Sequence, residues 1–180
     1  MNFDWTILQW IQENLRCAAL DFLMPKITML GNSGMIWIAI ALVMLCTKKY
    51  RKHGIVLLVG LLVGLLVGNI CLKNLVARAR PCWIDPTVPL LIGNPTDYSF
   101  PSGHTLSSVI AATILYDTDK CFGIPAIILA VLIAFSRLYL YVHFPTDVLA
   151  AALLGVLIGK LLHRWHDERG AGPRIKTNIE

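Results

Sequence analysis

A run of nineteen uncharged residues, Gly54–Leu72, constrains the fold of this chain more than any other feature. At about 1.5 Å per residue, a helix of that length nearly crosses the ~30 Å hydrocarbon layer of a bilayer. Inside the run the tetrapeptide LLVG occurs three times in succession, which places Gly60, Gly64 and Gly68 four residues apart. Glycines at that spacing let a neighbouring helix approach closely. The run therefore predicts a transmembrane helix whose glycine face packs against another helix.

Four more apolar segments accompany this helix. Gly34–Thr47 is short for a crossing and is expected to gain length from the preceding Ile27–Ser33; the others are Thr105–Tyr116, Phe122–Phe135 and Asp147–Leu162. Because 56% of the residues are hydrophobic, lipid is the expected solvent. The sequence predicts an all-α, polytopic membrane helix bundle with about five transmembrane helices, forming a single membrane-embedded domain over residues 1–180.

The N-terminal segment, residues 1–30, has a different pattern. Apolar residues including Trp10 alternate with polar ones at helical spacing, which is typical of an amphipathic helix lying in the membrane interface. Pro25 is expected to kink or end the helix that enters it. Met1–Trp5 contains no Lys or Arg, so it lacks the basic start of a cleaved signal peptide and is expected to be retained.

The net charge of +5 does not favour nucleic-acid binding, because the basic residues form short clusters beside apolar runs. We expect them to flank the membrane. One side would hold ten Lys and Arg, namely Lys48, Lys49, Arg51, Lys52, Lys120, Lys160, Arg164, Arg169, Arg174 and Lys176. The other would hold six: Arg16, Lys26, Lys73, Arg78, Arg80 and Arg137. The richer side, with the tail 166–180, is then cytoplasmic, and Ala79–Phe100 and Ser136–Thr146 are extracytoplasmic.

The five cysteines indicate neither a redox pair nor a metal site. They form no C-x-x-C pair and have no metal-like spacing with histidine: Cys17, Cys46, Cys71, Cys82 and Cys121. We expect them to pack in the core. No metal or cofactor is expected.

The segment Phe100–His104 has the composition of an anion-binding helix start. The preceding loop, Ala79–Phe100, is irregular, and together with Pro101 it holds five of the nine prolines. Pro101 can occupy the first position of a helix and Gly103 its first turn, which leaves N–H groups pointing at a bound anion. Gly103 permits close approach, and the Ser102 hydroxyl can donate. An ordinary helix start remains the alternative for this segment alone.

His143 and Asp147 lie four apart across Pro145, which can open the next helix. Asp147 can then reach back to the residue before that helix, and its carboxylate can orient the imidazole of His143 as a nucleophile. A capping aspartate beside an interfacial histidine is the alternative. The cations Lys73, Arg80 and Arg137 could surround a phosphate dianion. We expect Arg78, outside this set, to solvate a helix end; the alternative is that it lines the rim of the site and attracts an anionic substrate.

Taken together, these residues resemble the three-part signature of the type 2 phosphatidic acid phosphatase superfamily. The parts are Lys73-x6-Arg80-Pro81, then Pro101-Ser102-Gly103-His104, then Ser136-Arg137-x5-His143-x3-Asp147. The resemblance covers about residues 54–165. It implies a helical membrane fold and metal-independent phosphoryl transfer through a phosphohistidine. It further implies that His143 is the nucleophile, Asp147 its orienting partner and His104 the acid and base. The implied phosphate ligands are Lys73, Arg80, Ser102, Gly103 and Arg137.

The expected activity is release of phosphate from a lipid phosphate or diphosphate at the extracytoplasmic face, in a bacterial plasma membrane. Undecaprenyl pyrophosphate is the favoured substrate because small members with outward sites resemble bacterial carrier-lipid recyclers. Phosphatidate and phosphatidylglycerophosphate are the alternatives. A vanadate-dependent haloperoxidase shares the anion cradle but is soluble and larger, which the apolar composition disfavours. A lipid or anion transporter would have little use for a His-Asp pair beside a second histidine.

Overall fold

The computed structural model describes residues 3–170, and in this part of the chain it is all-α, as predicted. The long helices are α1 (Phe3–Asn14), α2 (Ala18–Leu30), α3 (Met35–Cys46), α4 (Arg51–Gly64), α7 (Gly103–Thr118), α8 (Lys120–Tyr139) and α9 (Pro145–Gly170). Short elements connect them: η1 (Asn32–Gly34), the π-helical η2 (Leu65–Leu72), α5 (Lys73–Val76) and α6 (Pro81–Ile84). Residues 171–180 of the expected cytoplasmic tail, with Arg174 and Lys176, lie outside the described residues, as do Met1 and Asn2.

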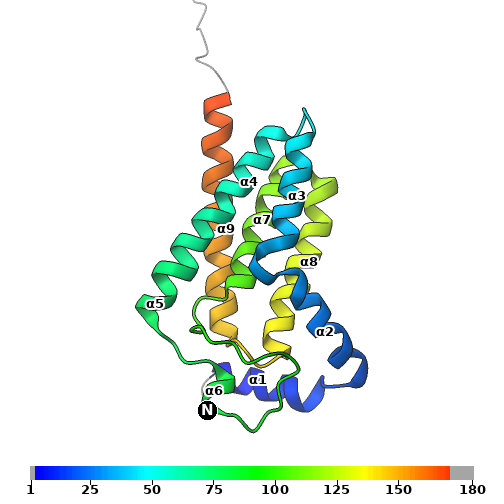
Figure 1. The fold of residues 1–180 in the computed structure, drawn as a ribbon, viewed down its shortest axis with the longest axis vertical. Coiled ribbons are helices and arrows are strands. Elements are labelled where there is room, and N and C mark those ends of the chain that lie inside the picture. Colours follow the sequence, from blue (N-terminus) through cyan, green and yellow to red (C-terminus); the bar gives the residue numbers. More distant parts are fainter. Residues whose placement is uncertain (1–2, 171–180) are drawn as a thin grey trace, which may run out of the picture.

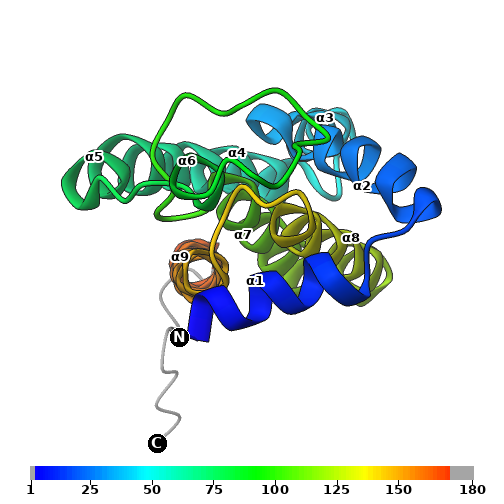
Figure 2. The same ribbon diagram turned by 90° about the horizontal axis from the view of Figure 1, so that it is seen from below.

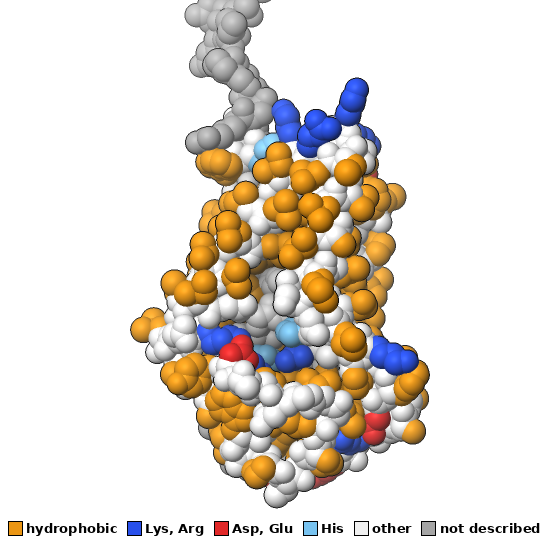
Figure 3. Space-filling view, viewed as in Figure 1, with side chains coloured by type: hydrophobic (Ala, Val, Ile, Leu, Met, Phe, Trp, Pro, Cys, Tyr) orange, Lys and Arg blue, Asp and Glu red, His pale blue; other side chains and the backbone are white. Residues whose placement is uncertain are grey.

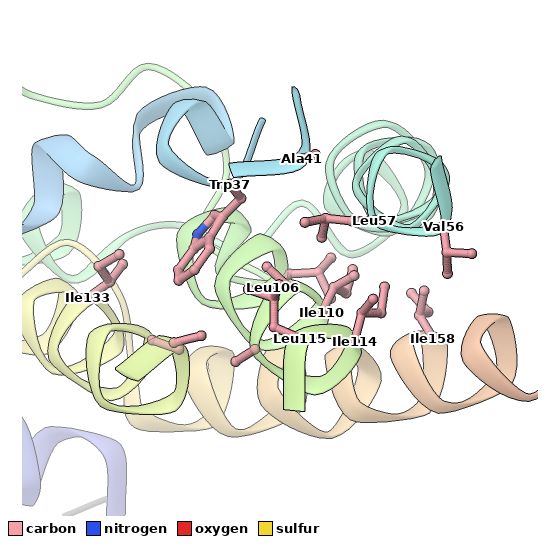
Figure 4. Packing of buried hydrophobic residues seen from close by; sticks show 14 of the residues in the cluster. Trp37, Ala41, Val56, Leu57, Leu106, Ile110, Ile114, Leu115, Ile133 and Ile158 are labelled. Carbon is pink, nitrogen blue, oxygen red and sulfur yellow. The ribbon is translucent and has the colours of Figure 1, made fainter. Parts of the chain in front are cut away.

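Helix α7 lies at the centre of the bundle and packs against α4, α8 and α9 (Figures 1 and 2). Its side chains Leu106, Ile110 and Ile114 are fully or almost fully buried, and they meet Leu57 of α4 in the main core cluster (Figure 4). Trp37 of α3 is also buried there and donates its indole N–H to Ser108 Oγ at 3.0 Å. Burial of the polar indole nitrogen is tolerated because that hydrogen bond satisfies it.

The glycine face predicted from the LLVG repeat is confirmed, and its partner is α7. A Cβ on Gly64 would lie 2.6 Å from Cδ1 of Ile110, and one on Gly68 would lie 2.3 Å from Cδ2 of Leu106. A Cβ on Gly60 would lie 2.9 Å from Cγ2 of Ile110. The glycines therefore let α4 and η2 approach the central helix, as expected for small residues at a membrane helix interface.

The protein is an integral membrane protein. Within the described residues, three helical segments are long and apolar enough to cross a bilayer: Arg51–Ile84, Lys120–Tyr139 and Pro145–His166. A fourth candidate is the bent pair Ala18–Leu30 and Asn32–Cys46, which meet at 44°. The fifth expected segment, α7, has 16 residues, or about 24 Å of helix, and falls short of the ~30 Å hydrocarbon layer. It is enclosed by the other helices.

The N-terminal segment divides into two helices. Helix α1 lies across one end of the bundle, beneath α8 and α9 (Figure 2). Of the expected kink or end at Pro25, the end is excluded, because α2 continues through Pro25 to Leu30; a bend of 44° separates α2 from the helix that follows Gly31. Beyond Gly31, Ser33 and Gly34 have positive φ values of 52° and 67°, which break the helix before α3.

The surface divides into zones along the bundle (Figure 3). Lys and Arg side chains gather at the end where α3 meets α4, and a band of exposed apolar side chains covers the middle. A hollow with Lys, Arg and His side chains lies beyond that band. The cysteines were expected to pack in the core, and this is wrong for four of the five. Cys82 is buried, whereas Cys17, Cys46, Cys71 and Cys121 are exposed.

Candidate active site

The hollow near one end of the bundle has a volume of about 700 Å³ and contains most of the residues predicted from the sequence. Six of the eight predicted residues line it: Lys73, Arg80, Gly103, His104, Arg137 and His143. The other two, Ser102 and Asp147, lie fully buried behind its wall. The three parts of the signature come together at this end of the bundle. Helix η2 ends there, α7 begins there, and the connection between α8 and α9 lies there.

Three cations are buried at the polar end of the hollow: Lys73, Arg80 and Arg137, whose exposed fractions are 6%, 2% and 4%. Lys73 and Arg80 both pair with Asp97. Among residues 3–170, no ion pair joins Arg137 to a carboxylate; its Nη1 donates to Thr28 Oγ1 at 2.7 Å, and its buried Nε has no hydrogen-bond partner. A buried cation without an anion is costly, so this arrangement favours an anionic ligand.

Asp97, which the sequence analysis did not single out, sits between two of these cations. Its Oδ1 accepts from Arg80 Nη2 at 2.6 Å, its Oδ2 accepts from Lys73 Nζ, and its carbonyl oxygen accepts from Arg80 Nε at 2.7 Å. Burial raises the pKa of Asp97, but its hydrogen bonds with Lys73 and the charges of Lys73 and Arg80 outweigh this and lower the pKa to about 2. Asp97 therefore stays ionised and occupies the cations that a phosphate would need.

An Asp97→Asn variant is expected to bind inorganic phosphate or vanadate about tenfold more tightly, because one negative charge leaves the anion site. Inhibition constants for the two anions, measured at constant ionic strength, test this. Asp117→Asn is the matched control, since Asp117 pairs with Lys160 outside the hollow. Weaker inhibition in Asp97→Asn would mean that Asp97 organises the cations rather than competing with the anion.

His143 lies in the connection between α8 and α9 and is 1% exposed. Its Nε2 is 3.1 Å from Arg80 Nη1, so this nitrogen faces the cations. Burial first, and then the charges of Arg80, Arg137 and Lys73, hold the pKa of His143 well below its usual value. The imidazole is therefore neutral near pH 7. With Nε2 accepting from Arg80, the proton lies on Nδ1, and the Nε2 lone pair points toward the anion site.

Asp147 approaches the other ring nitrogen, together with Ser99. Asp147 Oδ2 is 3.7 Å from His143 Nδ1, too long for a hydrogen bond, and Ser99 Oγ is 3.4 Å from the same nitrogen. Ser99 Oγ donates to Asp147 Oδ2 at 2.5 Å, and the Phe144 N–H donates to it at 2.8 Å. The predicted reach back to the residue before the helix is thus confirmed, and Ser99 is an additional partner of the His-Asp pair.

The anion cradle at the start of α7 differs in one respect from the prediction. The helix begins at Gly103, and Ser102 is its cap, with its hydroxyl accepting from Thr105 N at 3.5 Å and from Thr105 Oγ1 at 3.0 Å. Pro101 therefore lies before the cap and does not occupy the first helical position as expected. The N–H groups of Gly103 and His104, the first two of α7, have no partner inside the helix and remain available to an anion.

Arg137 contacts the last turns of α2, and His104 contacts the segment that joins α2 to α3. His104 Nε2 lies 2.9 Å from Asn32 Oδ1, and Thr28 accepts from Arg137. Gly31 leaves room for the ring: a Cβ there would lie 2.9 Å from His104 Cδ2. Residues 1–53 lie outside the family signature and were not predicted to take part in the site; the small polar residues at and after the end of α2 were the available signal.

Arg78 does not solvate a helix end, so that expectation is wrong. It donates to Asp147 Oδ1 at 2.6 Å through Nη1 and to Asp4 Oδ2 at 2.6 Å through Nη2. Thr146 completes the group by donating its N–H to Asp4 Oδ1 at 3.0 Å. Arg78 thus neutralises the fully buried Asp147 and ties α1 to the start of α9. An arginine two residues before a signature arginine was the only hint in the sequence.

An Arg78→Ala variant is expected to lower kcat about tenfold with little change in KM, since Arg78 holds Asp147 but does not line the hollow. Arg78→Lys should restore part of the loss, because lysine can reach one of the two carboxylates but cannot bridge both. Steady-state kinetics of purified variants test this, with Arg16→Ala as the control outside the site. A loss expressed mainly in KM would place Arg78 in substrate binding instead.

Comparisons with known proteins agree with this geometry. Residues 53–171 match the PAP2 superfamily. The chain is 37% identical to an undecaprenyl-diphosphatase of Sulfolobus acidocaldarius over 89% of this chain and 77% of that protein. The fold resembles LpxE of Aquifex aeolicus (TM-score 0.80, 26% identity, 91% and 96% of the two chains). It also resembles a transmembrane PAP2-type phosphatidylglycerolphosphate phosphatase of Bacillus subtilis (TM-score 0.75, 29% identity, 97% and 90%).

Proposed function

The chain belongs to the PAP2 superfamily, and from that premise we propose that it releases phosphate from a lipid phosphate or diphosphate, with undecaprenyl pyrophosphate preferred. One observation carries the proposal: the hollow is cationic at one end and apolar at the other. The buried, unpaired Arg137 supports an anion at the cationic end. The similarity to an undecaprenyl-diphosphatase supports the choice of lipid. Phosphatidate and phosphatidylglycerophosphate are the alternatives.

The apolar end of the hollow suits the lipid tail. It extends between α3 and α4 over the side chains Ile38, Leu58, Leu61, Leu62 and Leu65. Leu62 and Leu65 are about half exposed on the surface that forms the apolar band, so this end opens toward the bilayer. A lipid can therefore keep its tail among apolar groups while its phosphate reaches His143, with no need to leave the membrane.

The proposed reaction has two displacements on phosphorus. In the first, His143 Nε2 forms a P–N bond as the P–O bond to the lipid breaks, and His104 protonates the departing oxygen. In the second, His104 takes a proton from water, which attacks phosphorus, breaks the P–N bond and releases inorganic phosphate. Lys73, Arg80 and Arg137, with the N–H groups at the start of α7, stabilise the charge on the equatorial oxygens. The protein supplies this stabilisation without a metal.

The site is proposed to lie on the extracytoplasmic side of the membrane. Along the sequence, the segments assigned to the side opposite the hollow hold ten Lys and Arg, and those assigned to the side of the hollow hold six; Arg174 and Lys176 among the ten lie outside the described residues. Short basic loops are retained in the cytoplasm, so the hollow would face outward.

Phosphate release from purified protein in detergent micelles containing EDTA tests the activity. The substrates are undecaprenyl pyrophosphate, undecaprenyl phosphate, phosphatidate and phosphatidylglycerophosphate, compared by kcat/KM. We expect turnover in EDTA and the highest kcat/KM for undecaprenyl pyrophosphate. Activity that requires added Mg²⁺ would contradict the metal-independent mechanism. A preference for a glycerolipid would leave the mechanism intact and replace the substrate.

A further inference from the structure

Asn69 lies in the hollow, and neither the signature nor the proposed mechanism gives it a role. It belongs to η2, where the helix between α4 and α5 widens into a π-helical turn. Its amide lies flat against Gly103, because a Cβ on Gly103 would be 2.7 Å from Asn69 Oδ1 and 3.1 Å from its Nδ2. The missing side chain of Gly103 therefore makes room for Asn69 at the edge of the anion cradle. Turns of this kind are frequent at functional sites.

The amide of Asn69 has no hydrogen-bond partner. Its Oδ1 is shielded from solvent and unsatisfied, and within residues 3–170 the structure records no hydrogen bond made by this side chain. A primary amide offers two donors and an acceptor, and leaving the shielded acceptor without a partner costs free energy. Buried polar groups are nearly always paired, so an unpaired amide lining a cavity indicates a partner supplied by the ligand.

The position of Asn69 along the helix indicates which part of the ligand it meets. Four residues later, and on the same side, lies the cation Lys73; four residues earlier lies Leu65, where the apolar end begins. Leu65, Asn69 and Lys73 all line the hollow, so Asn69 lies between the apolar end and the cations. A lipid whose terminal phosphoryl group meets Lys73 and whose tail passes Leu65 must place its headgroup–tail junction beside Asn69.

We propose that Asn69 binds the leaving group, namely the phosphoryl group that stays on the lipid when a diphosphate is cleaved; this inference rests on the proposed function. The cations hold the terminal phosphoryl group, and the second one lies a single bridging oxygen further toward the tail. Rotation of the amide about its last torsion presents Nδ2–H to an oxygen of that second group. Negative charge grows there as the bridging P–O bond breaks, so the hydrogen bond strengthens in the transition state. Asn69 thereby favours diphosphates over monophosphates.

The test compares two substrates with the same tail, undecaprenyl pyrophosphate and undecaprenyl phosphate, in Asn69→Leu and Asn69→Ala. Loss of a hydrogen bond to a charged group should lower kcat/KM for the diphosphate by about ten- to a hundredfold. The monophosphate should lose much less, so the ratio of the two constants should fall at least about tenfold. The inhibition constant of vanadate should stay nearly unchanged while kcat/KM for the diphosphate falls, because vanadate occupies only the cradle. Two variants guard against misfolding, and thermal unfolding of each is measured.

Asn74→Leu is the matched control, an exposed asparagine on the adjoining turn whose amide donates to Ile70 O at 2.8 Å. Equal losses for both substrates, with weaker vanadate inhibition, would place Asn69 in the cradle and overturn the proposal, as would no loss at all. Binding of both lipids to His143→Ala protein, with and without Asn69→Leu, gives a readout that needs no turnover. If the wild-type protein hydrolyses neither lipid, the proposed function fails, while this binding ratio still decides the role of Asn69.

Discussion

A His143→Ala variant is expected to lose about 10⁴-fold or more in kcat for every lipid phosphate, because the nucleophile is removed and no neighbouring group replaces it. His143 is neutral, its Nε2 faces the cations, and its Nδ1 lies beside Ser99 and Asp147. The loss should appear in kcat, since the anion site made by Lys73, Arg80 and Arg137 remains. Phosphate release from purified protein measures the effect, and lipid binding shows that the site is still formed.

His166→Ala is the matched control for this variant. His166 lies near His53 on the cytoplasmic side proposed for α9, away from the hollow, so its loss should leave kcat unchanged. The phosphohistidine itself can be sought by mixing enzyme with ³²P-labelled lipid and quenching in alkali, which preserves a P–N bond. Label bound to wild-type protein and absent from His143→Ala is the expected result. Substantial turnover by His143→Ala would remove the basis of the mechanism.

A His104→Ala variant is expected to lose about 10²- to 10⁴-fold in kcat, the range for removal of a general acid and base. The reason is that the departing oxygen goes unprotonated and the attacking water is not activated. The size of the loss in the first step should depend on the leaving group. With p-nitrophenyl phosphate, whose leaving group needs no proton, formation of the phosphoenzyme should be spared while its hydrolysis is slowed.

The expected consequence is that labelled phosphoenzyme accumulates in His104→Ala when the leaving group is good, and rapid alkaline quench measures its amount over time. His104→Gln gives a second variant that retains a hydrogen-bonding group near Asn32 Oδ1. Suppose that no phosphoenzyme accumulates with the lipid phosphate or with p-nitrophenyl phosphate, and that the variant loses activity equally toward these two substrates. His104 then acts by binding phosphate and not by moving a proton.

The helices could be read from the sequence because lipid imposes a simple rule on them. A backbone in hydrocarbon must satisfy its own hydrogen bonds, so long uncharged runs become helices. The runs Gly54–Leu72, Phe122–Phe135 and Asp147–Leu162 correspond to helices that meet the length and composition for crossing a membrane. The same rule does not place helix ends or bends. Helix α2 continues through Pro25, and the break falls at Gly31, shortly before the positive φ values of Ser33 and Gly34.

Part of the site could also be predicted from the sequence, since its ionisable residues lie at the ends of apolar segments. Charged groups at such positions are costly and indicate a functional site. Six of the eight predicted residues line one hollow. Asp97, Ser99 and Arg78 were not found, because aspartate, serine and arginine are ordinary residues of polar loops. Only their contacts with Lys73, Arg80 and Asp147 distinguish them.

By itself the sequence determined the helical membrane fold, the glycine face and the three-part set of residues predicted to bind phosphate, because these depend on composition and short spacing. Only the tertiary structure decided which charged side chains pair with one another. Asp97 pairs with Lys73 and Arg80, and Asp4 reaches Thr146 across 142 residues of chain. It also decided that Asn69 lies unpaired against Gly103. The physical reason is that burial and pairing of charges are set by how helices pack, and packing joins residues that no local pattern connects.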